Sequence, residues 1–246
     1  MSKETDTVLR ETGVRAVDAS QALFNRQLAT YRKVTRANLM YHREVYGLLL
    51  EVLIAEAPAP FRFLDIACGD ASASADILRD LPIAYYYGID LSALSLDLAT
   101  QTLQSLPCQF DLRCRDFVEA MADWRDPIDV VWIGMSLHHL QIPQKLRLMK
   151  DVHRALQGSG IFLIWEPTCL DGEGRAEWLD RFASNRPTWA ALTDDEFAEM
   201  ESHMRLADFP EKAEIWMTMG HQAGFAHADE LYAMPNRFGR VFKFWN

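Results

Sequence analysis

The chain is 246 residues long and 49% hydrophobic, which is enough for one substantial core, and a single α/β domain of this length is common. The chain has 25 Lys and Arg against 35 Asp and Glu, so its net charge is −10, and it contains no basic run. We therefore expect no nucleic-acid partner, because neutralisation of phosphates dominates the binding of nucleic acids. The longest apolar runs have the length of strands, so we expect no membrane span and no membrane partner.

The cysteines show no metal-ligand spacing; they are Cys68, Cys108, Cys114 and Cys169. Nothing resembling a signal peptide precedes them, so a reducing cytoplasm is the simplest setting. The sequence also contains no internal repeat and no low-complexity linker.

Residues 1–58 have a helical pattern and form an expected N-terminal cap. Two apolar stripes run through them: Phe24, Leu28 and Tyr31 form one, and Val45, Leu49, Val52 and Leu53 form the other. The simplest interpretation is that these helices cover a sheet. A second interpretation is a polar and aromatic cap over a ligand cleft, made of Tyr31, Arg32, Arg36, Tyr41 and His42. One of the arginines would then pair with a carboxylate of the ligand.

The segment 61–90 is typical of a nucleotide-type cofactor site. An apolar run at 61–66 predicts a buried strand, the small residues after it predict a tight turn close to a ligand, and residues 72–81 predict a helix. A second apolar run at 84–89 predicts the next strand. Asp90 at its end is placed to accept two hydrogen bonds from ribose hydroxyls.

The turn itself argues against a dinucleotide. A pyrophosphate requires the Gly-x-Gly-x-x-Gly spacing and a helix N-terminus free of negative charge. Here Gly69 is the only glycine of the turn, and Asp65 and Asp70 would repel a pyrophosphate. The same acids could face a ligand that carries an ammonium and a sulfonium group. S-adenosylmethionine is such a ligand.

The turn resembles the first motif of the class I S-adenosylmethionine-dependent methyltransferases, which is commonly Asp-x-Gly-x-Gly-x-Gly. This chain has Asp65-Ile66-Ala67-Cys68-Gly69-Asp70-Ala71, with alanine at two of the three glycine positions. The resemblance covers roughly residues 61–245. It implies a methyltransferase core at 59–246 with an α/β fold: a Rossmann-like, doubly wound, seven-stranded sheet, mostly parallel, with an antiparallel C-terminal hairpin strand. The cofactor contacts implied in this part of the chain are Asp65, Ala67, Gly69, Asp90 and Leu91.

The next elements extend the expected cofactor site. Ser92 is a suitable N-cap for a helix to about Leu106. Residues 108–114 alternate between apolar and polar side chains, which suits a strand at the edge of a sheet. Where this strand ends, the resemblance implies that Asp116 accepts a hydrogen bond from the adenine amino group and that Phe117 packs against the ring.

A buried strand is predicted at 128–133, and the segment after it is expected to face the cofactor cleft, because ligands bind beyond the carboxyl ends of such strands. Met135 is expected to contact the cofactor. His138 and His139 follow, and since adjacent side chains diverge, at most one should point at the reacting centre. We assign His138 to catalysis and His139 to anchoring the next helix.

The remaining elements complete the expected order. A helix at 143–156 stops at residues 158–160, and a fifth strand at 161–165 ends at Glu166. A helical lid insertion follows at 168–210, with helices at 174–185 and 193–206. The last elements are a helix that ends at Gly224 and paired strands at 228–232 and 239–245. The aromatic and Met side chains of the lid either pack as core or line a substrate pocket.

The resemblance implies methyl transfer to a small-molecule acceptor through an oxygen or nitrogen nucleophile, with S-adenosylhomocysteine as product. The protein must align nucleophile, methyl carbon and sulfur, and it must exclude water. His138 and Glu166 are the candidates for a base that activates a hydroxyl or a protonated amine. No metal is implied, because no cluster of carboxylates and histidines has ligand spacing.

Other functions are compatible with the same residues. The cleft could run a nonmethyl S-adenosylmethionine reaction or use NAD. Alternatively, the domain could bind the cofactor as a non-catalytic partner or sensor, and transfer of a labelled methyl group would separate an enzyme from a binder. A homodimer is one assembly that we consider.

Overall fold

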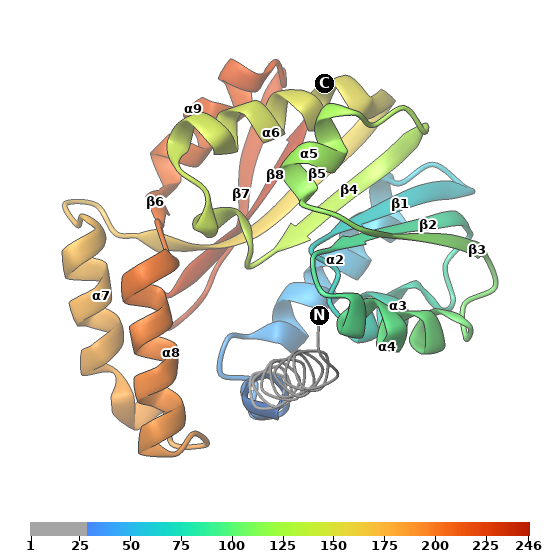
Figure 1. The fold of residues 1–246 in the computed structure, drawn as a ribbon. Coiled ribbons are helices and arrows are strands. Elements are labelled where there is room, and N and C mark those ends of the chain that lie inside the picture. Colours follow the sequence, from blue (N-terminus) through green and yellow to red (C-terminus); the bar gives the residue numbers. More distant parts are fainter. Residues whose placement is uncertain (1–28) are drawn as a thin grey trace, which may run out of the picture.

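The computed structural model describes residues 29–246, and its centre is a single sheet flanked by helices (Figure 1). The strands are β1 (Phe61–Ile66), β2 (Ile83–Asp90), β3 (Gln109–Cys114), β4 (Ile128–Gly134), β5 (Leu156–Cys169), β6 (Glu211–Lys212), β7 (His227–Ala233) and β8 (Gly239–Trp245). Their order is β3-β2-β1-β4-β5-β8-β7, and β6 pairs with the end of β5. Neighbours are parallel except that β8 is antiparallel to β5 and β7. The expected fold class is therefore confirmed.

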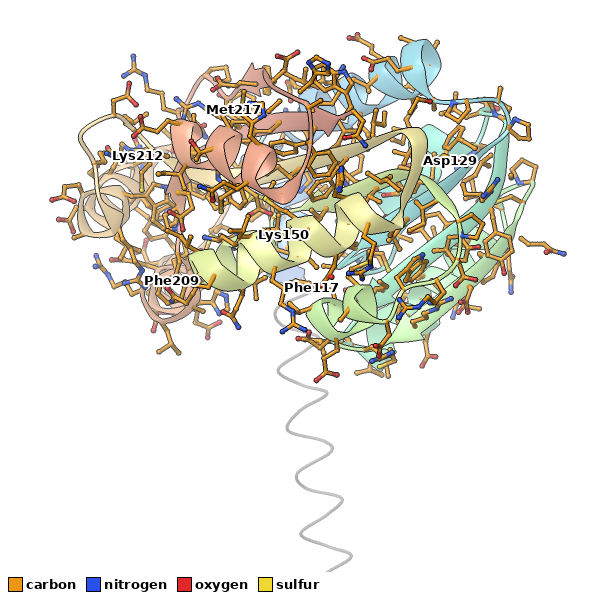
Figure 2. All side chains as sticks on the ribbon, turned by 90° about the horizontal axis from the view of Figure 1, so that it is seen from above. Phe117, Asp129, Lys150, Phe209, Lys212 and Met217 are labelled. Carbon is orange, nitrogen blue, oxygen red and sulfur yellow. The ribbon has the colours of Figure 1, made fainter. Side chains whose placement is uncertain are left out.

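Two helical layers cover the sheet (Figure 1). The first consists of α2 (His42–Glu56), α3 (Ser72–Leu78) and α4 (Ala93–Leu103), and the second of α5 (Phe117–Ala122), α6 (Ile142–Ala155) and α9 (Ala213–Ala223). Figure 2 views the second layer from outside, with Phe117 on α5, Lys150 on α6 and Met217 on α9. No helix among residues 29–246 is both long and apolar enough to cross a membrane.

The central strands are buried on both faces because both layers pack on them. In β4, Val130 and Trp132 belong to the core on the side of α2 and α3, whereas Val131 and Ile133 belong to the core on the side of α6 and α9. This is the usual alternation of side chains along a strand. By the same alternation Asp65, two residues after the buried Phe63, faces the layer that contains α3.

The turn after β1 keeps the backbone of a glycine-rich motif although two glycines are missing. Ala67, Gly69 and Ala71 have φ values of 57°, 55° and 55°, so all three lie in the left-handed region. Glycine adopts this conformation freely, whereas alanine is strained there because its Cβ approaches the backbone. The three motif positions therefore share one conformation, and the two alanines bear strain in it.

Several boundaries differ from those predicted. The helix expected to reach Leu81 ends at Leu78, and Leu81 itself precedes a proline, a position where helical backbone is disfavoured. The helix expected to reach Leu106 ends at Leu103. The fifth strand begins directly after α6 and is much longer than predicted, so Glu166 lies inside it and pairs with Arg240 of β8. The short helix α5 was not predicted.

The N-terminal cap is described from residue 29, so the predicted stripe residues Phe24 and Leu28 lie outside the described residues. Residues 29–36 are helical, as expected. The second stripe is confirmed as the buried face of α2, and it consists of Val45, Leu49, Val52 and Leu53. Since α2 packs against α3, this part of the cap belongs to the first helical layer.

The expected lid contains α7 (Arg175–Ser184), a 3-10 helix η2 (Arg186–Trp189) and α8 (Asp194–Ala207). Thr193 and Glu196 form a capping box that begins α8. Phe182 of α7 stacks on Phe197 of α8 with ring centroids 4.9 Å apart, and it also lies 5.9 Å from the ring of Phe238, next to β8. An aromatic core thus holds the two lid helices together and against the sheet.

We expect Trp178→Ala to lower the free energy of unfolding by about 3–5 kcal/mol, because Trp178 is 0% exposed and packs near Phe238. Leu206→Ala on α8 is the control, since Leu206 is 82% exposed and its loss should be nearly neutral. Chemical denaturation measures both. Equal stability of the two variants would contradict the assignment of Trp178 to the core.

The two strained alanines predict an unusual response to glycine. Ala67→Gly should raise the free energy of unfolding by roughly 0.5–1 kcal/mol, because the relief of left-handed strain exceeds the added entropy of the unfolded chain. Ala73→Gly, within α3, should lower it by a similar amount, since glycine weakens a helix. Thermal unfolding of both variants tests whether the free energy of unfolding changes in opposite directions. A lower stability of Ala67→Gly would contradict the assignment of strain to Ala67.

Candidate active site

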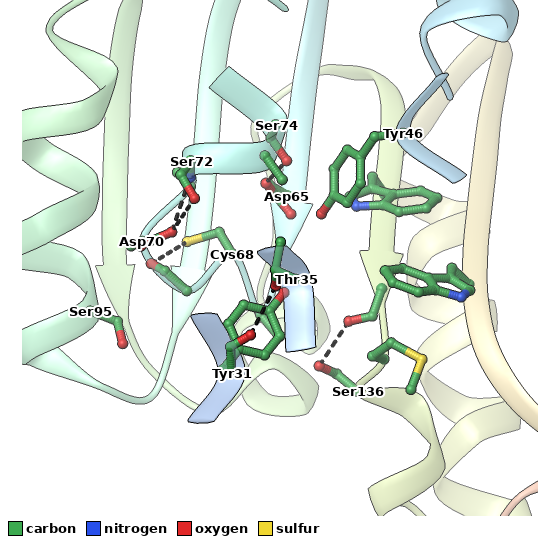
Figure 3. A pocket seen from close by; sticks show the side chains of 18 residues that line it. Tyr31, Thr35, Tyr46, Asp65, Cys68, Asp70, Ser72, Ser74, Ser95 and Ser136 are labelled. Atoms are coloured by element: carbon green, nitrogen blue, oxygen red, sulfur yellow. Dashed lines mark hydrogen bonds between the residues drawn. The ribbon is translucent and has the colours of Figure 1, made fainter. Parts of the chain in front are cut away.

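The carboxyl ends of β1 and β4 open into a cavity of about 320 Å³, in the position expected for an open α/β sheet (Figure 3). The turn after β1 and the first turn of α3 form one side of it. Trp132 of β4 and Trp165 of β5 form another. Tyr31 and Thr35, from the helix at 29–36, close it on the N-terminal side.

Asp65 lines this cavity from β1 and is 3% exposed (Figure 3). Its Oδ2 atom accepts hydrogen bonds from the Ser74 hydroxyl at 2.5 Å and the Tyr86 hydroxyl at 2.8 Å. Burial raises the pKa of its carboxyl group from 3.8 to about 6, although the two hydroxyl bonds act in the opposite direction. Within the described residues both bonds go to Oδ2, so Oδ1 is the oxygen left to bind a ligand.

Asp90 holds the turn after β1 against the end of β2. Its Oδ2 atom accepts from the backbone N–H of Gly69 at 2.9 Å, and Oδ1 accepts from that of Ser92 at 2.8 Å. A carboxylate has about four lone-pair positions, so these two bonds leave acceptor capacity. Asp90 therefore has a structural role in the turn before any ligand is considered.

The other predicted cofactor residues fall into two groups. Ala67, Gly69, Met135 and Tyr31 line the cavity, together with Asp65. Asp90, Leu91, Asp116, Phe117 and Arg36 are not among its lining residues.

The contacts and exposure of three residues of the second group can be described. Asp116 is the N-cap of α5, and its Oδ1 accepts from the backbone N–H groups of Val118 and Glu119. Leu91 is 67% exposed. Arg36 is exposed, and Arg32, one turn earlier, approaches the loop instead, with its guanidinium 3.8 Å from the carboxylate of Asp70.

Several lining residues were missed by the sequence analysis, and they are Thr35, Tyr46, Ser74, Trp132 and Trp165. Trp132 and Trp165 are nearly fully buried, so their pattern along the strands is the same as that of core residues. Ser74 was detectable in principle, because it lies in the first turn of a helix that begins beside the predicted loop.

A second cavity of about 380 Å³ adjoins the first, and Tyr31 and Met135 line both. Its apolar lining comes from the N-terminal cap, the lid and the segment after β7, and it consists of Val34, Met40, Trp189, Met200, Met204 and Phe238. Its polar lining is acidic and histidine-rich, and no Lys or Arg is among the described residues that line it, although Lys33 pairs with the lining residue Glu196. The lid therefore contributes in both predicted ways, as core through Trp178 and as pocket lining through Met200 and Met204.

Glu166 is 0% exposed, and its carboxylate holds the segment between β4 and α6 in place. The backbone N–H groups of Ser136, Leu137 and His138 donate to it at 3.0, 2.8 and 3.1 Å. The ring Nδ1 of His138 lies 2.7 Å from Glu166 Oε2. All these contacts join Glu166 to the protein itself, so its carboxylate is not presented to either cavity. The prediction that Glu166 serves as a base does not fit this geometry.

His138 and His139 belong to a short 3-10 helix, η1 (Leu137–His139), and both line the second cavity. Their rings converge on Asp208, which follows α8 and is 4% exposed. Asp208 Oδ1 lies 3.7 Å from His138 Nε2 and 3.3 Å from His139 Nδ1. Adjacent side chains were expected to diverge, but the turn of the 3-10 helix brings the two ring centroids to 4.1 Å.

Comparison with known proteins agrees with this architecture. Residues 63–160 match the family model described as a methyltransferase domain. Trans-aconitate 2-methyltransferase from Rhodopseudomonas palustris (strain BisB18) is 29% identical over 122 residues, which make up 48% of this chain and 44% of that protein. The match thus spans less than half of the relative's length.

Solved structures share the fold at low sequence identity. An O-methyltransferase family protein from Burkholderia thailandensis has a TM-score of 0.59 at 17% identity, over 85% of this chain and 57% of that chain. The structure of PigF with S-adenosylhomocysteine has a TM-score of 0.53 at 17% identity, over 76% of this chain and 50% of that chain. The matched domain, the motif after β1 and the strand order together make this chain similar to the class I S-adenosylmethionine-dependent methyltransferases, with the family match confined to residues 63–160.

Proposed function

We propose that the protein transfers the methyl group of S-adenosylmethionine to a small molecule held in the second cavity. The observation that carries this proposal is the junction of the two cavities, where Tyr31 and Met135 line both. A cofactor in the first cavity with its sulfur at this junction would present its methyl group to the second. Such an arrangement aligns the reacting atoms, and the lid limits access of water.

The first cavity offers groups of suitable charge for the cofactor. The free Oδ1 of Asp65 would accept from the cationic ammonium group, and the turn residues Ala67 and Gly69 would let the backbone approach the ligand. The unused lone pairs of Asp90 would accept from the ribose hydroxyls. Asp116 and Phe117, at the end of the neighbouring strand, are proposed contacts for the adenine, with Leu91 beside them in sequence.

The second cavity supports an acceptor that is largely apolar and carries one polar nucleophile, for which we propose an oxygen. The name of the curated relative points to trans-aconitate as its acceptor. The second cavity is lined by the acidic residues Glu196, Glu199 and Asp208, whose negative charges would repel a carboxylate. We therefore propose an acceptor of a different charge class from that of the relative.

Among the two predicted catalytic residues, we assign the acceptor contact to His138 and a positioning role to Glu166. The contact with Glu166 favours the tautomer with the proton on Nδ1, which leaves a lone pair on Nε2. His138 lines the second cavity, so this lone pair can act on the acceptor. The buried carboxylate of Glu166 fixes both the ring and the backbone that carries it.

We expect cofactor affinity to fall as the pH is lowered through about 6. Above that pH Asp65 is ionised and attracts the ammonium group, whereas below it the carboxyl group is neutral. Linkage of one proton gives a loss of affinity that approaches roughly tenfold per pH unit. Isothermal titration with S-adenosylhomocysteine between pH 5 and 8 measures the effect.

The matched variant for that titration is Asp65→Asn, which keeps an oxygen that can accept from Ser74 and Tyr86. In this variant the ligand's ammonium group loses a charge-assisted hydrogen bond worth about 1.5–3 kcal/mol. S-adenosylhomocysteine should therefore bind roughly 10- to 100-fold more weakly at pH 8, and its affinity should no longer depend on pH. A pH dependence that survives in Asp65→Asn would refute the assigned role.

We expect His138→Ala to lower turnover by about 10²- to 10⁴-fold while leaving S-adenosylhomocysteine affinity nearly unchanged, because His138 lines only the second cavity. The measurement is transfer of tritium from methyl-labelled cofactor to an acceptor selected from a panel of small hydroxyl compounds. Unchanged turnover in His138→Ala would remove the residue from the mechanism. Failure of any acceptor to gain label, with the cofactor bound, would favour a cofactor-binding partner or sensor.

A further inference from the structure

We propose that His138, His139 and Asp208 form a binding site for a divalent transition-metal ion in the wall of the second cavity. One ligand atom from each residue lies within 4.8 Å of the other two. Two imidazoles and one carboxylate are a familiar ligand set for Zn²⁺ and Fe²⁺. The sequence predicted no metal site because Asp208 is far from the two histidines along the chain, and only the folded lid brings them together.

The carboxylate of Asp208 is the independent observation that points to a ligand. Its Oδ1 atom is buried and has no hydrogen-bond partner in the described structure. Three histidine nitrogens surround this oxygen, at 3.3 Å in His139, 3.7 Å in His138 and 3.9 Å in His203. A buried acceptor without a partner is costly, whereas a cation bound by the same atoms would satisfy it.

His138 has the second contact that metal-binding histidines usually make. Its Nδ1 atom is 2.7 Å from the buried carboxylate of Glu166, so Nε2 is the nitrogen free to bind a metal. A carboxylate behind a histidine fixes the tautomer and the ring orientation and increases the basicity of the ligand nitrogen. Glu166 thus orients His138 so that its Nε2 lone pair can bind the metal.

The backbone around Asp208 is also fixed in place. The N–H of Phe209, the next residue, donates to the His138 carbonyl at 2.7 Å. Lys145 is 0% exposed, and its ammonium group donates to the Phe209 carbonyl and to Glu211. The segment that contains Asp208 is therefore hydrogen-bonded directly to the segment that contains the two histidines. Metal–ligand bonds of about 2.0–2.2 Å require only a modest contraction of the cluster.

A metal bound by three protein atoms keeps positions open for other ligands. This step rests on the proposed function: an acceptor hydroxyl in the second cavity would bind the metal through its oxygen and release its proton to solvent. That oxygen would then form a bond to the methyl carbon as the carbon–sulfur bond breaks, and the electron pair of that bond would stay on sulfur. The acceptor would then be a hydroxyl compound that can bind a metal. The lone pair on His138 Nε2 would bind the metal and would not remove the proton of the acceptor.

The test is metal binding by the full chain after dialysis against a chelator. Titration with Co²⁺, followed by its visible absorption, should give one ion per chain, and Zn²⁺ should displace it. Asp208→Asn and His139→Ala should weaken binding at least roughly 100-fold, since each removes a direct ligand. His227→Ala is the control, because His227 is exposed on β7 and distant in sequence from the cluster.

Each outcome decides for or against the site. Stoichiometric binding that is lost in the two ligand variants and kept in His227→Ala supports it. Absence of stoichiometric binding in the wild-type protein, or equal binding in Asp208→Asn, overturns it. Titration with S-adenosylhomocysteine shows that each variant is folded. It also separates the two proposals, because cofactor binding without metal binding would refute the metal site alone.

Discussion

The arrangement of both cavities depends on one buried carboxylate. Glu166 is fully enclosed, and a charge in such a place is tolerated only when hydrogen bonds compensate the lost hydration. Three consecutive backbone N–H groups and the ring of His138 supply them. The result is a fixed turn after β4, with Met135 at the junction of the cavities and His138 facing the second.

Backbone strain is concentrated at the same edge of the sheet. Ala67 and Ala71 in the turn after β1 and Met135 after β4 all have φ values near 55°. Non-glycine residues adopt this conformation only when their surroundings enforce it, and here the enforcement can be identified. Asp90 accepts from the N–H of Gly69, and Met135 donates its own N–H to the Trp165 carbonyl at 2.7 Å. The turns that face the proposed cofactor are thus held by their neighbours in the sheet.

The lid is coupled mechanically to the proposed reaction site. The residues after α8 are joined to η1 through the hydrogen bond from the Phe209 N–H to the His138 carbonyl, and to α6 through the buried ammonium group of Lys145, which donates to the Phe209 carbonyl. At its other end, the aromatic core around Phe182 holds α7 and α8 to each other. Because Asp208 directly follows α8, the position of this helix sets the distance between Asp208 and the two histidines.

The sequence predicted the parts of the fold that depend on local pattern. Continuous apolar runs predicted β1, β2 and β4, and Ser92, as a capping residue, predicted the start of α4. The extent of β5 was not predictable, because pairing with three other strands lengthens it: with β4 at Leu156, with β8 as far as Pro167 and with β6 at Thr168 and Cys169. That pairing decides whether Glu166 ends a strand or lies buried within one.

The candidate site was best predicted where a residue type is tied to a motif. Asp65 and Gly69 line the cavity and were found from the turn itself. Trp132 and Trp165 were missed because a cavity wall and a core have the same apolar periodicity. Asp208 was missed because its position beside His139 arises from packing of the lid, which no spacing along the chain encodes.

The central claim is that the junction of the two cavities is where the methyl group is delivered. A crystal structure of the protein with S-adenosylhomocysteine tests it most directly. We expect the sulfur of the ligand beside Tyr31 and Met135, with its ammonium group at Asp65 Oδ1. A sulfur that faces away from the second cavity, with the adenine at Tyr31 and Met135, would contradict it.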